Sequence, residues 1–149
     1  MTKKLFVGIG LAIVAAIVGC ASQTEMMAPF VNVSIYRGVD SSNAGRAKLG
    51  PGQFAFNADL STFSSPASAP VQKACNYMFT ATPAVAAVGA SGAVVGLPGY
   101  VATFDDHPQG HWSIAAPPGT AAVDAASAVS TYTQANRGNV VNGTNLACN

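Results

Sequence analysis

The chain has 149 residues, of which 50% are hydrophobic and only 9% are charged, and its formal net charge is +1. Wholesale disorder is excluded, because disordered chains combine low hydrophobicity with high charge. The few basic residues form no positive stripe for phosphate groups, so the composition also argues against a nucleic-acid partner.

The first twenty residues have the pattern of an export signal. Lys3 and Lys4 precede the uncharged apolar run Leu5–Val18, and Ile17-Val18-Gly19-Cys20 ends it. The run fits the roughly 7 to 15 residues of a signal-peptide core and is short of the about 20 residues that a membrane span needs. Cleavage at another site and an uncleaved anchor remain open as alternatives.

The end of this segment resembles the lipobox of bacterial lipoproteins. The resemblance implies cleavage after Gly19 and attachment of diacylglycerol to the sulfur of Cys20. It divides the chain into a signal peptide over residues 1–19, a tether over residues 20–28 and one domain over residues 29–149.

The same resemblance implies a location and a partner. The mature protein would lie in the cell envelope, held on the lipid membrane by its N-terminus. Because the residue after the lipidated cysteine is Ala21 and not Asp, the class implies sorting to the outer membrane in Gram-negative cells. An envelope protein or a second copy of the chain is a further candidate partner.

Two cysteines, Cys75 and Cys148, remain once Cys20 is assigned to lipid. An even pair in an oxidising compartment predicts one disulfide, which would fix the C-terminus to the middle of the chain. Closing so long a loop is worth about 4 to 5 kcal/mol in the chain-entropy model. Two reduced, separately buried thiols are the alternative.

The clearest predicted strand is Phe30–Tyr36, where apolar residues alternate with Asn and Ser. Gly38–Gly52 follows as a turn-rich segment. A second strand is predicted over Gln53–Leu60, because both of its phenylalanines fall on one face. A Ser, Pro and Ala loop over Ser61–Pro70 comes next, and a helix over Val71–Met78 with Ser68 as its cap.

The uncharged segment Ala84–Leu97 consists of small and β-branched residues. Gly92 and Gly96 are four residues apart, as in helix interfaces built on small residues. The segment is short and lies between Pro83 and Pro98, so a buried strand pair or a hairpin with a glycine-containing turn is favoured over a membrane-associated helix.

Candidate chemistry is confined to the segment Asp105-Asp106-His107-Pro108-Gln109-Gly110-His111-Trp112. Neutral His and ionised Asp are suitable ligands for a divalent metal, so a metal site would use His107, His111 and either Asp105 or Asp106. In a second version, Asp106 orients His111 as a base.

A solvated turn between strands Tyr100–Phe104 and His111–Ala115 is the favoured interpretation of this segment, with Trp112 packed on the core. A catalytic zinc normally has three protein ligands and a water. A hydrolase needs a nucleophile and an oxyanion hole, and the sequence shows no recognisable motif for either. Further along, Thr120–Ala135 is compatible with a small amphipathic helix.

Together these features predict a small, single-domain, β-rich α+β protein with antiparallel strands and one or two short helices. We predict a membrane-anchored cell-envelope lipoprotein with a structural or protein-interaction role, no enzymatic activity and no cofactor. The alternatives are a glycan- or small-ligand-binding module that displays Tyr100, Trp112 and Tyr132, a metal-dependent enzyme at residues 105–111, and a self-assembling surface subunit.

Overall fold

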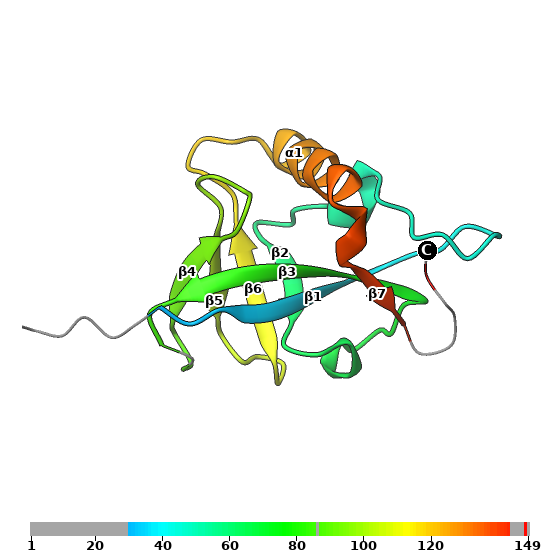
Figure 1. Cartoon of the computed structure of the whole chain (residues 1–149). Helices are drawn as coiled ribbons and strands as arrows, with labels where there is room; N and C mark the ends of the chain where they lie inside the picture. The colour runs from blue at the N-terminus through cyan, green and yellow to red at the C-terminus, as the bar shows by residue number, and fades with distance from the viewer. Residues whose placement is uncertain (1–29, 86, 144–147, 149) are drawn as a thin grey trace, which may run out of the picture.

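The computed structural model describes residues 30–85, 87–143 and 148. In this part of the chain six antiparallel strands close into a barrel, and a seventh strand and one α-helix pack against it (Figure 1). The prediction of a small β-rich domain with antiparallel strands is confirmed. Closure of the sheet into a barrel, instead of a plain α+β arrangement, is a feature that the sequence pattern did not predict.

The strands are β1 (Val33–Val39), β2 (Leu60–Phe63), β3 (Cys75–Pro83), β4 (Ser91–Val94), β5 (Val101–Phe104), β6 (His111–Ala115) and β7 (Val140–Asn142). The helical elements are α1 (Ala122–Ala135) and the 3-10 turns η1 (Pro51–Phe54), η2 (Pro66–Ser68) and η3 (Arg137–Asn139). Around the barrel the order is β1-β2-β6-β5-β4-β3, and β3 pairs again with β1 to close the ring. β7 adds to β3.

The longest ladder of the barrel joins β1 to β3, from Val33 opposite Ala81 to Val39 opposite Cys75. Alternate residues of β3 from Cys75 to Pro83 are buried, which is the period of two expected for a sheet with one face toward a core. In β1, Ile35 and Val39 are buried on one face, and Arg37 between them is half-buried. The predicted strand Phe30–Tyr36 is therefore confirmed in type, although the strand itself begins at Val33.

The predicted helix over Val71–Met78 is wrong, because β3 begins at Cys75 and continues to Pro83. From Cys75 onward the buried residues Cys75, Tyr77, Phe79 and Ala81 alternate along the strand. Pairing with β1 on one side and with β4 and β7 on the other outweighs the local helix signal. Ser68 does not cap a helix. It ends the 3-10 turn η2, whose cap is the Ser65 hydroxyl accepting from the Ala67 amide at 3.2 Å.

The predicted strand over Gln53–Leu60 is also wrong. Pro51–Phe54 forms the 3-10 turn η1, and β2 begins only at Leu60 and runs into the segment predicted as a loop. Phe54 and Phe56 are both buried, as their common face predicted. Phe54 packs edge-on against the rings of Tyr77 and Phe79, with centroids 6.4 and 6.3 Å away, so burial of one aromatic ring determines this turn.

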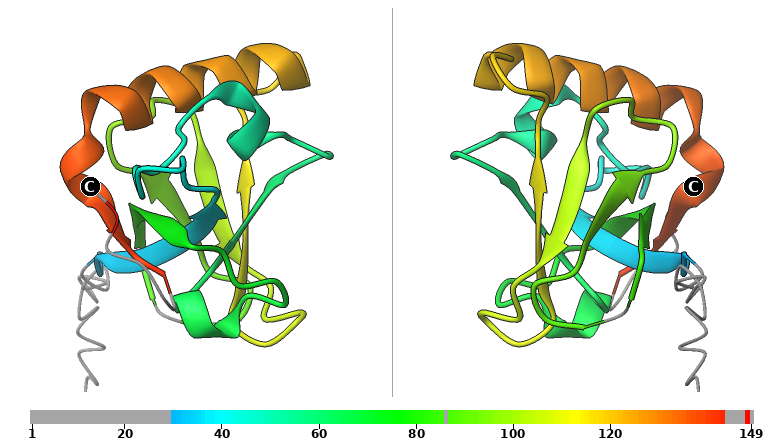
Figure 2. Two further views of the ribbon diagram at one scale, coloured as in Figure 1. Left: turned by 90° about the vertical axis from the view of Figure 1, so that its right-hand side faces the viewer. Right: turned by 90° about the vertical axis from the view of Figure 1, so that its left-hand side faces the viewer.

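Helix α1 lies across one end of the barrel (Figure 2). The helix expected over Thr120–Ala135 is thus present, from Ala122 to Ala135. One face of it is buried: Ala125, Ala126, Val129, Ser130 and Thr133. Polar side chains fix α1 and the following turn η3 to the chain before η1. The Ser130 hydroxyl of α1 donates to the Leu49 carbonyl at 2.7 Å, and Arg137 of η3 donates to the Ala47 carbonyl at 2.9 Å. Among the residues that the structure describes, we find no helix with the length and apolarity of a membrane span.

The segment Ala84–Leu97 contributes one strand, β4, which pairs with the end of β3 and with β5. The predicted strand character is confirmed, but both partner strands lie outside the segment, and only Val94 of β4 is buried. The helix-packing alternative is wrong: Gly92 lies in β4, and Gly96 lies in the turn that follows. A Cβ atom on Gly92 would be 2.2 Å from the Pro83 nitrogen, and one on Gly96 would be 2.4 Å from the Tyr132 ring. Both glycines are thus explained by close packing within the barrel.

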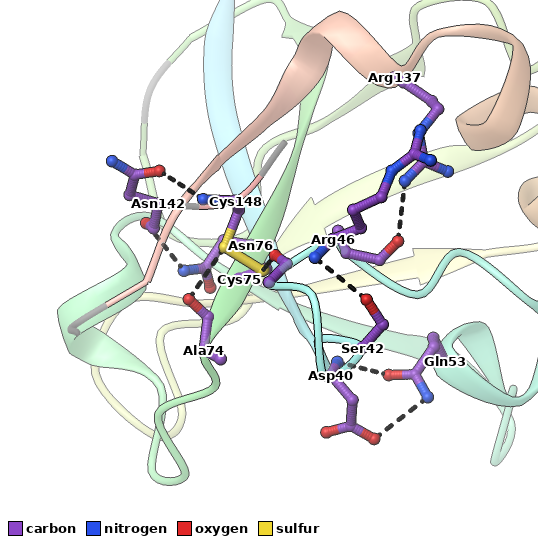
Figure 3. Close-up of a disulfide and its surroundings, with 12 residues drawn as sticks. Asp40, Ser42, Arg46, Gln53, Ala74, Cys75, Asn76, Arg137, Asn142 and Cys148 are labelled. Atoms are coloured by element: carbon purple, nitrogen blue, oxygen red, sulfur yellow. Dashed lines mark hydrogen bonds between the residues drawn. A yellow bond between two sulfur atoms is a disulfide. The ribbon is translucent and has the colours of Figure 1, made fainter. Parts of the chain in front are cut away.

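The predicted disulfide between Cys75 and Cys148 is present (Figure 3). It links the first residue of β3 to a residue beyond β7, at a sequence separation of 73. The Cys148 amide also donates to the Asn142 side-chain oxygen at 3.0 Å, so the described C-terminal residue is fixed beside β3 by a covalent bond and a hydrogen bond.

Candidate functional site

The barrel has one weakly paired seam, between β1 and β2. These two strands share a single residue pair, Tyr36 opposite Phe63. Beyond it the side chain of Arg37 takes the place of the missing ladder, because Nε donates to the Gln53 carbonyl at 3.1 Å and Nη1 donates to the Ser61 carbonyl at 3.0 Å. The seam is therefore held by a guanidinium instead of by backbone pairing.

Two cavities adjoin this seam, and Arg37 and Ser61 line both of them. The larger has a volume of about 430 Å³, and its other lining residues are Gly38, Phe63, Ala69, Pro70, Val71 and Lys73. The smaller has a volume of about 280 Å³, and its other lining residues are Ala55, Asn57, Ala58, Asp59, His111 and Ser113. One cavity is thus mainly apolar and the other mainly polar, with the same arginine and serine between them.

Arg37 is partly buried and has no carboxylate partner among the described residues. Burial lowers its pKa below the ordinary value for arginine, which reflects the cost of removing the charge from water. A guanidinium has five N–H groups, and Arg37 uses two of them on carbonyl oxygens. The other cation at the larger cavity, Lys73, is paired with Asp40 at 2.7 Å. Arg37 therefore retains both charge and hydrogen-bond donors for an anion.

Ser61 and His111 meet across β2 and β6. The register places His111 opposite Phe63, so Ser61 is its diagonal neighbour on the same face of the sheet. The Ser61 Oγ and His111 Nε2 atoms are 2.7 Å apart. The imidazole of His111 packs edge-on against the Phe63 ring, with the ring centroids 5.2 Å apart. The His111 side chain is only 14% exposed. The contact is thus fixed by strand register and by an aromatic neighbour.

The other imidazole nitrogen of His111 contacts a carboxylate. His111 Nδ1 lies 2.6 Å from Asp105 Oδ1, just beyond the end of β5. The Ser113 hydroxyl donates to Asp105 Oδ2 at 2.9 Å, and the His107 amide donates to Oδ1 at 3.1 Å. Burial tends to raise the pKa of Asp105, but these hydrogen bonds outweigh burial and lower its pKa. Asp105 is therefore held as an ionised acceptor.

These contacts determine which of the two ring nitrogens of His111 carries the proton when the imidazole is neutral. An ionised carboxylate only accepts hydrogen bonds, so Nδ1 of His111 carries the proton and donates to Asp105. Nε2 is then an acceptor, and the Ser61 hydroxyl donates to it. The arrangement can thus move a proton from Ser61 to His111 while Asp105 stabilises the cation that forms.

The candidate metal ligands of the 105–111 segment do not converge. Asp105 contacts His111, whereas Asp106 accepts from the Gly110 amide at 2.6 Å and the His107 side chain is exposed. Among the described residues, no group of three or more His, Cys, Asp or Glu side chains is arranged to hold a metal ion. The favoured turn between two strands is confirmed, and the carboxylate that orients His111 is Asp105 and not Asp106.

Sequence reasoning missed Arg37 and Ser61. Ser61 lies 50 residues before His111 and was assigned to a loop, and Arg37 follows the predicted first strand without any motif. Placing a strand over Leu60–Phe63 would have been the signal for Ser61. In that strand Ser61 and Phe63 share one face, opposite to the face of the buried Leu60 and Thr62. The pairing of β2 with β6, which brings Ser61 to His111, has no signal in the local sequence.

The aromatic face expected for a glycan-binding module is not formed by the predicted residues. Trp112 is 4% exposed and Tyr100 is 5% exposed. The indole N–H donates to the Ser64 hydroxyl at 3.0 Å, whereas the Tyr100 hydroxyl donates to the Ala125 carbonyl in α1 at 3.3 Å. Both rings therefore belong to the core and its edges.

Cys20, the signal peptide over residues 1–19 and the tether over residues 20–28 lie outside the described residues. Comparisons with protein-family models, with curated proteins and with solved structures find no match to this chain.

Proposed function

We propose that this protein is a membrane-anchored lipoprotein of the cell envelope whose barrel binds a small anionic ligand at the β1–β2 seam. The lipobox pattern Ile17-Val18-Gly19-Cys20 supports the anchor. Arg37 is the observation that carries the binding role, because a partly buried cation without a carboxylate partner among the described residues favours an anion that enters from outside.

The lining of the larger cavity indicates the kind of anion. Beside Arg37 it presents the side chains of Phe63, Pro70 and Val71. An apolar wall next to a guanidinium suits a carboxylate with a short apolar chain, whose head would bind Arg37 while its chain is removed from water. The bound species would thus be a short-chain carboxylic acid or a molecule with that group at one end.

The binding test is a titration of the full-length protein in lipid nanodiscs with sodium hexanoate, followed through the ¹H–¹⁵N signals of Arg37 Nε and of the Val71 amide. We expect a saturable shift of both signals in the wild type. The Arg37→Gln variant should lose the shift at Val71, and Arg46→Gln should keep it, because Arg46 is exposed and lines neither cavity. Hexanol, which lacks the charge, should give no comparable shift. Equal binding by Arg37→Gln would refute the site.

The anchor has its own test, the intact mass of the protein purified from membranes of an expressing bacterium. We expect a chain that begins at Cys20 and carries diacylglycerol, and this species should be absent from a Cys20→Ser variant. An unlipidated wild-type chain would refute the anchor and leave the binding site to be judged separately.

A structural or protein-interaction role is the second candidate, and an apolar row on the outside of the barrel favours it. Ala93, Val101 and Ala115 are neighbours across β4, β5 and β6, and all three are exposed. Such a row suits contact with an envelope protein or a second copy of the chain. Sedimentation should then show association that Val101→Lys abolishes and that Val123→Lys, at an exposed valine of α1, retains. A monomer at every concentration would exclude self-assembly.

A further inference from the structure

We propose that Ser61 is the nucleophile of an acyl-transfer site that hydrolyses small esters of short-chain carboxylic acids, with His111 as its base and Asp105 as the positioning carboxylate. The inference rests on the proposed ligand cavity for the placement of the acyl group. It departs from the expectation of a non-enzymatic protein, which followed from the absence of a nucleophile motif in the sequence.

The geometry has the order of contacts that a serine nucleophile requires. The Ser61 hydroxyl donates to His111 Nε2 at 2.7 Å, and His111 Nδ1 donates to Asp105 at 2.6 Å. In such an arrangement the base removes the hydroxyl proton, while the carboxylate fixes the tautomer and stabilises the imidazolium. The three residues come from β2, β6 and the end of β5, so sheet pairing holds them in place.

Ser61 is the member of this set that can meet a substrate. It lines both cavities, whereas His111 lines only the smaller one. An acyl chain in the larger cavity, against Phe63, would leave the alcohol part of the ester in the smaller one, beside Asn57. The scissile carbonyl would then lie at Ser61, which lines both cavities.

The reaction balances with water as its only co-reactant. The Ser61 oxygen forms a bond to the carbonyl carbon, and His111 Nε2 takes the hydroxyl proton. His111 then returns this proton to the departing alcohol as the ester C–O bond breaks, which leaves Ser61 acylated. Water, deprotonated by His111, attacks the acyl carbon next, and the carboxylic acid leaves while Ser61 regains its proton.

Arg37 is the group that would stabilise the oxyanion of both tetrahedral intermediates. It shares both cavities with Ser61, and its Nη1 already donates to the Ser61 carbonyl. A partly desolvated guanidinium with unused N–H groups is an electrostatic stabiliser of a developing negative charge. Arg37 would also hold the carboxylate product, which links this activity to the proposed ligand.

The test is covalent labelling of the full-length protein in nanodiscs with an alkyl fluorophosphonate, read by mass spectrometry, together with hydrolysis of p-nitrophenyl hexanoate. We expect one adduct on the peptide that contains Ser61. Ser61→Ala should lose the adduct and the hydrolysis, and His111→Gln should lower the labelling rate by about 10²- to 10⁴-fold.

A matched control is Ser91→Ala, which changes another exposed serine, bonded to Thr103 at 2.8 Å and separated from the strand of His111 by β5. It should label at the wild-type rate. Each variant should keep the wild-type circular dichroism and unfolding transition, so that loss of labelling is not loss of the fold.

A pH profile separates a base from a merely structural histidine. The charged groups around the imidazole are Asp105 and, across the smaller cavity, Arg37 and Asp59. The labelling rate of the wild type should fall as the pH is lowered, because a protonated imidazole cannot accept the Ser61 proton. The residual rate of His111→Gln should not show this fall.

The outcomes separate this inference from the ligand proposal. If hexanoate binds and folded wild-type protein gives no adduct on Ser61, the acyl-transfer site is refuted and the ligand site stands. If Ser61 is labelled and hexanoate does not bind, the nucleophile is supported and the ligand proposal fails. An adduct that persists in Ser61→Ala would refute the assignment of the nucleophile.

Discussion

The two sides of β1 are built in different ways. On one side β1 pairs with β3 along seven residue pairs, and the disulfide at Cys75 lies at the end of that ladder. On the other side β1 meets β2 at one pair, and the side chain of Arg37 spans the rest. The difference teaches that the ladder uses its polar backbone groups internally, whereas the seam relies on side-chain donors and acceptors, which is where the proposed ligand would bind.

The largest effect should come from breaking the covalent link on the ladder side. Replacement of Cys148 by Ala opens the loop between Cys75 and Cys148, so the free energy of unfolding should fall by about 4 to 5 kcal/mol in the chain-entropy model. Urea unfolding measures this difference. Reductant should destabilise the wild type and leave the variant unchanged, and a loss below about 1 kcal/mol would contradict the assigned role.

The next effect concerns the aromatic core behind the ladder. Phe79→Ala should cost about 3 to 5 kcal/mol, because it leaves a cavity beside Phe54 and Tyr77. Ser61→Ala at the seam should cost no more than about 1 kcal/mol, the usual net worth of one hydrogen bond. Urea unfolding of both variants compares the two sides, and a seam variant as costly as the core variant would erase the distinction.

At the seam itself, Arg37→Leu should lower the free energy of unfolding by about 1 to 3 kcal/mol, because the carbonyls of Gln53 and Ser61 each lose a charged donor. Hexanoate should no longer stabilise this variant in thermal unfolding. Arg46→Leu provides the control, since Arg46 is exposed and should leave both properties unchanged. Full stability in Arg37→Leu would mean that the guanidinium does not hold the seam.

The smallest effect is on acid stability. Asp105 has a lowered pKa in the folded protein, so its contribution is complete above the ordinary aspartate pKa of 3.8 and is lost as the pH falls through the lower folded value. Asp105→Asn should therefore flatten the fall in stability below about pH 4. Because the carboxylate is 39% exposed, the change should be under about 1 kcal/mol. Thermal unfolding at several pH values would measure it, and an unchanged slope would contradict the assignment.

The parts of the fold that could be predicted are those with a strong local pattern. Strict alternation identified the first strand, and the turn around residues 105–110 was correctly placed between two strands. The errors at Gln53–Leu60 and Val71–Met78 have a common physical cause. There, burial of Phe54 and pairing of β3 with β1 decide the structure, and both depend on residues distant in sequence.

Of the four residues of the candidate site, the sequence singled out Asp105 and His111 but neither Ser61 nor Arg37. His111 and Asp105 are close in the chain, so their segment could be singled out from composition. Ser61 and Arg37 join them through the β2–β6 register and the open β1–β2 seam, and neither feature leaves a local signature. The disulfide was predictable, because two cysteines outside the lipobox can form only one intramolecular pair.

The arrangement of protons at His111 tests the proposed nucleophile most directly, because Ser61 needs an unprotonated Nε2 on His111 as its base. A long-range ¹H–¹⁵N spectrum at about pH 8, where imidazoles are usually neutral, distinguishes the two tautomers. We expect His111 to carry its proton on Nδ1, bonded to Asp105, with Nε2 unprotonated and accepting from Ser61. Asp105→Asn should weaken this preference. A proton on Nε2 in the wild type would contradict the account, since Ser61 would then have no base.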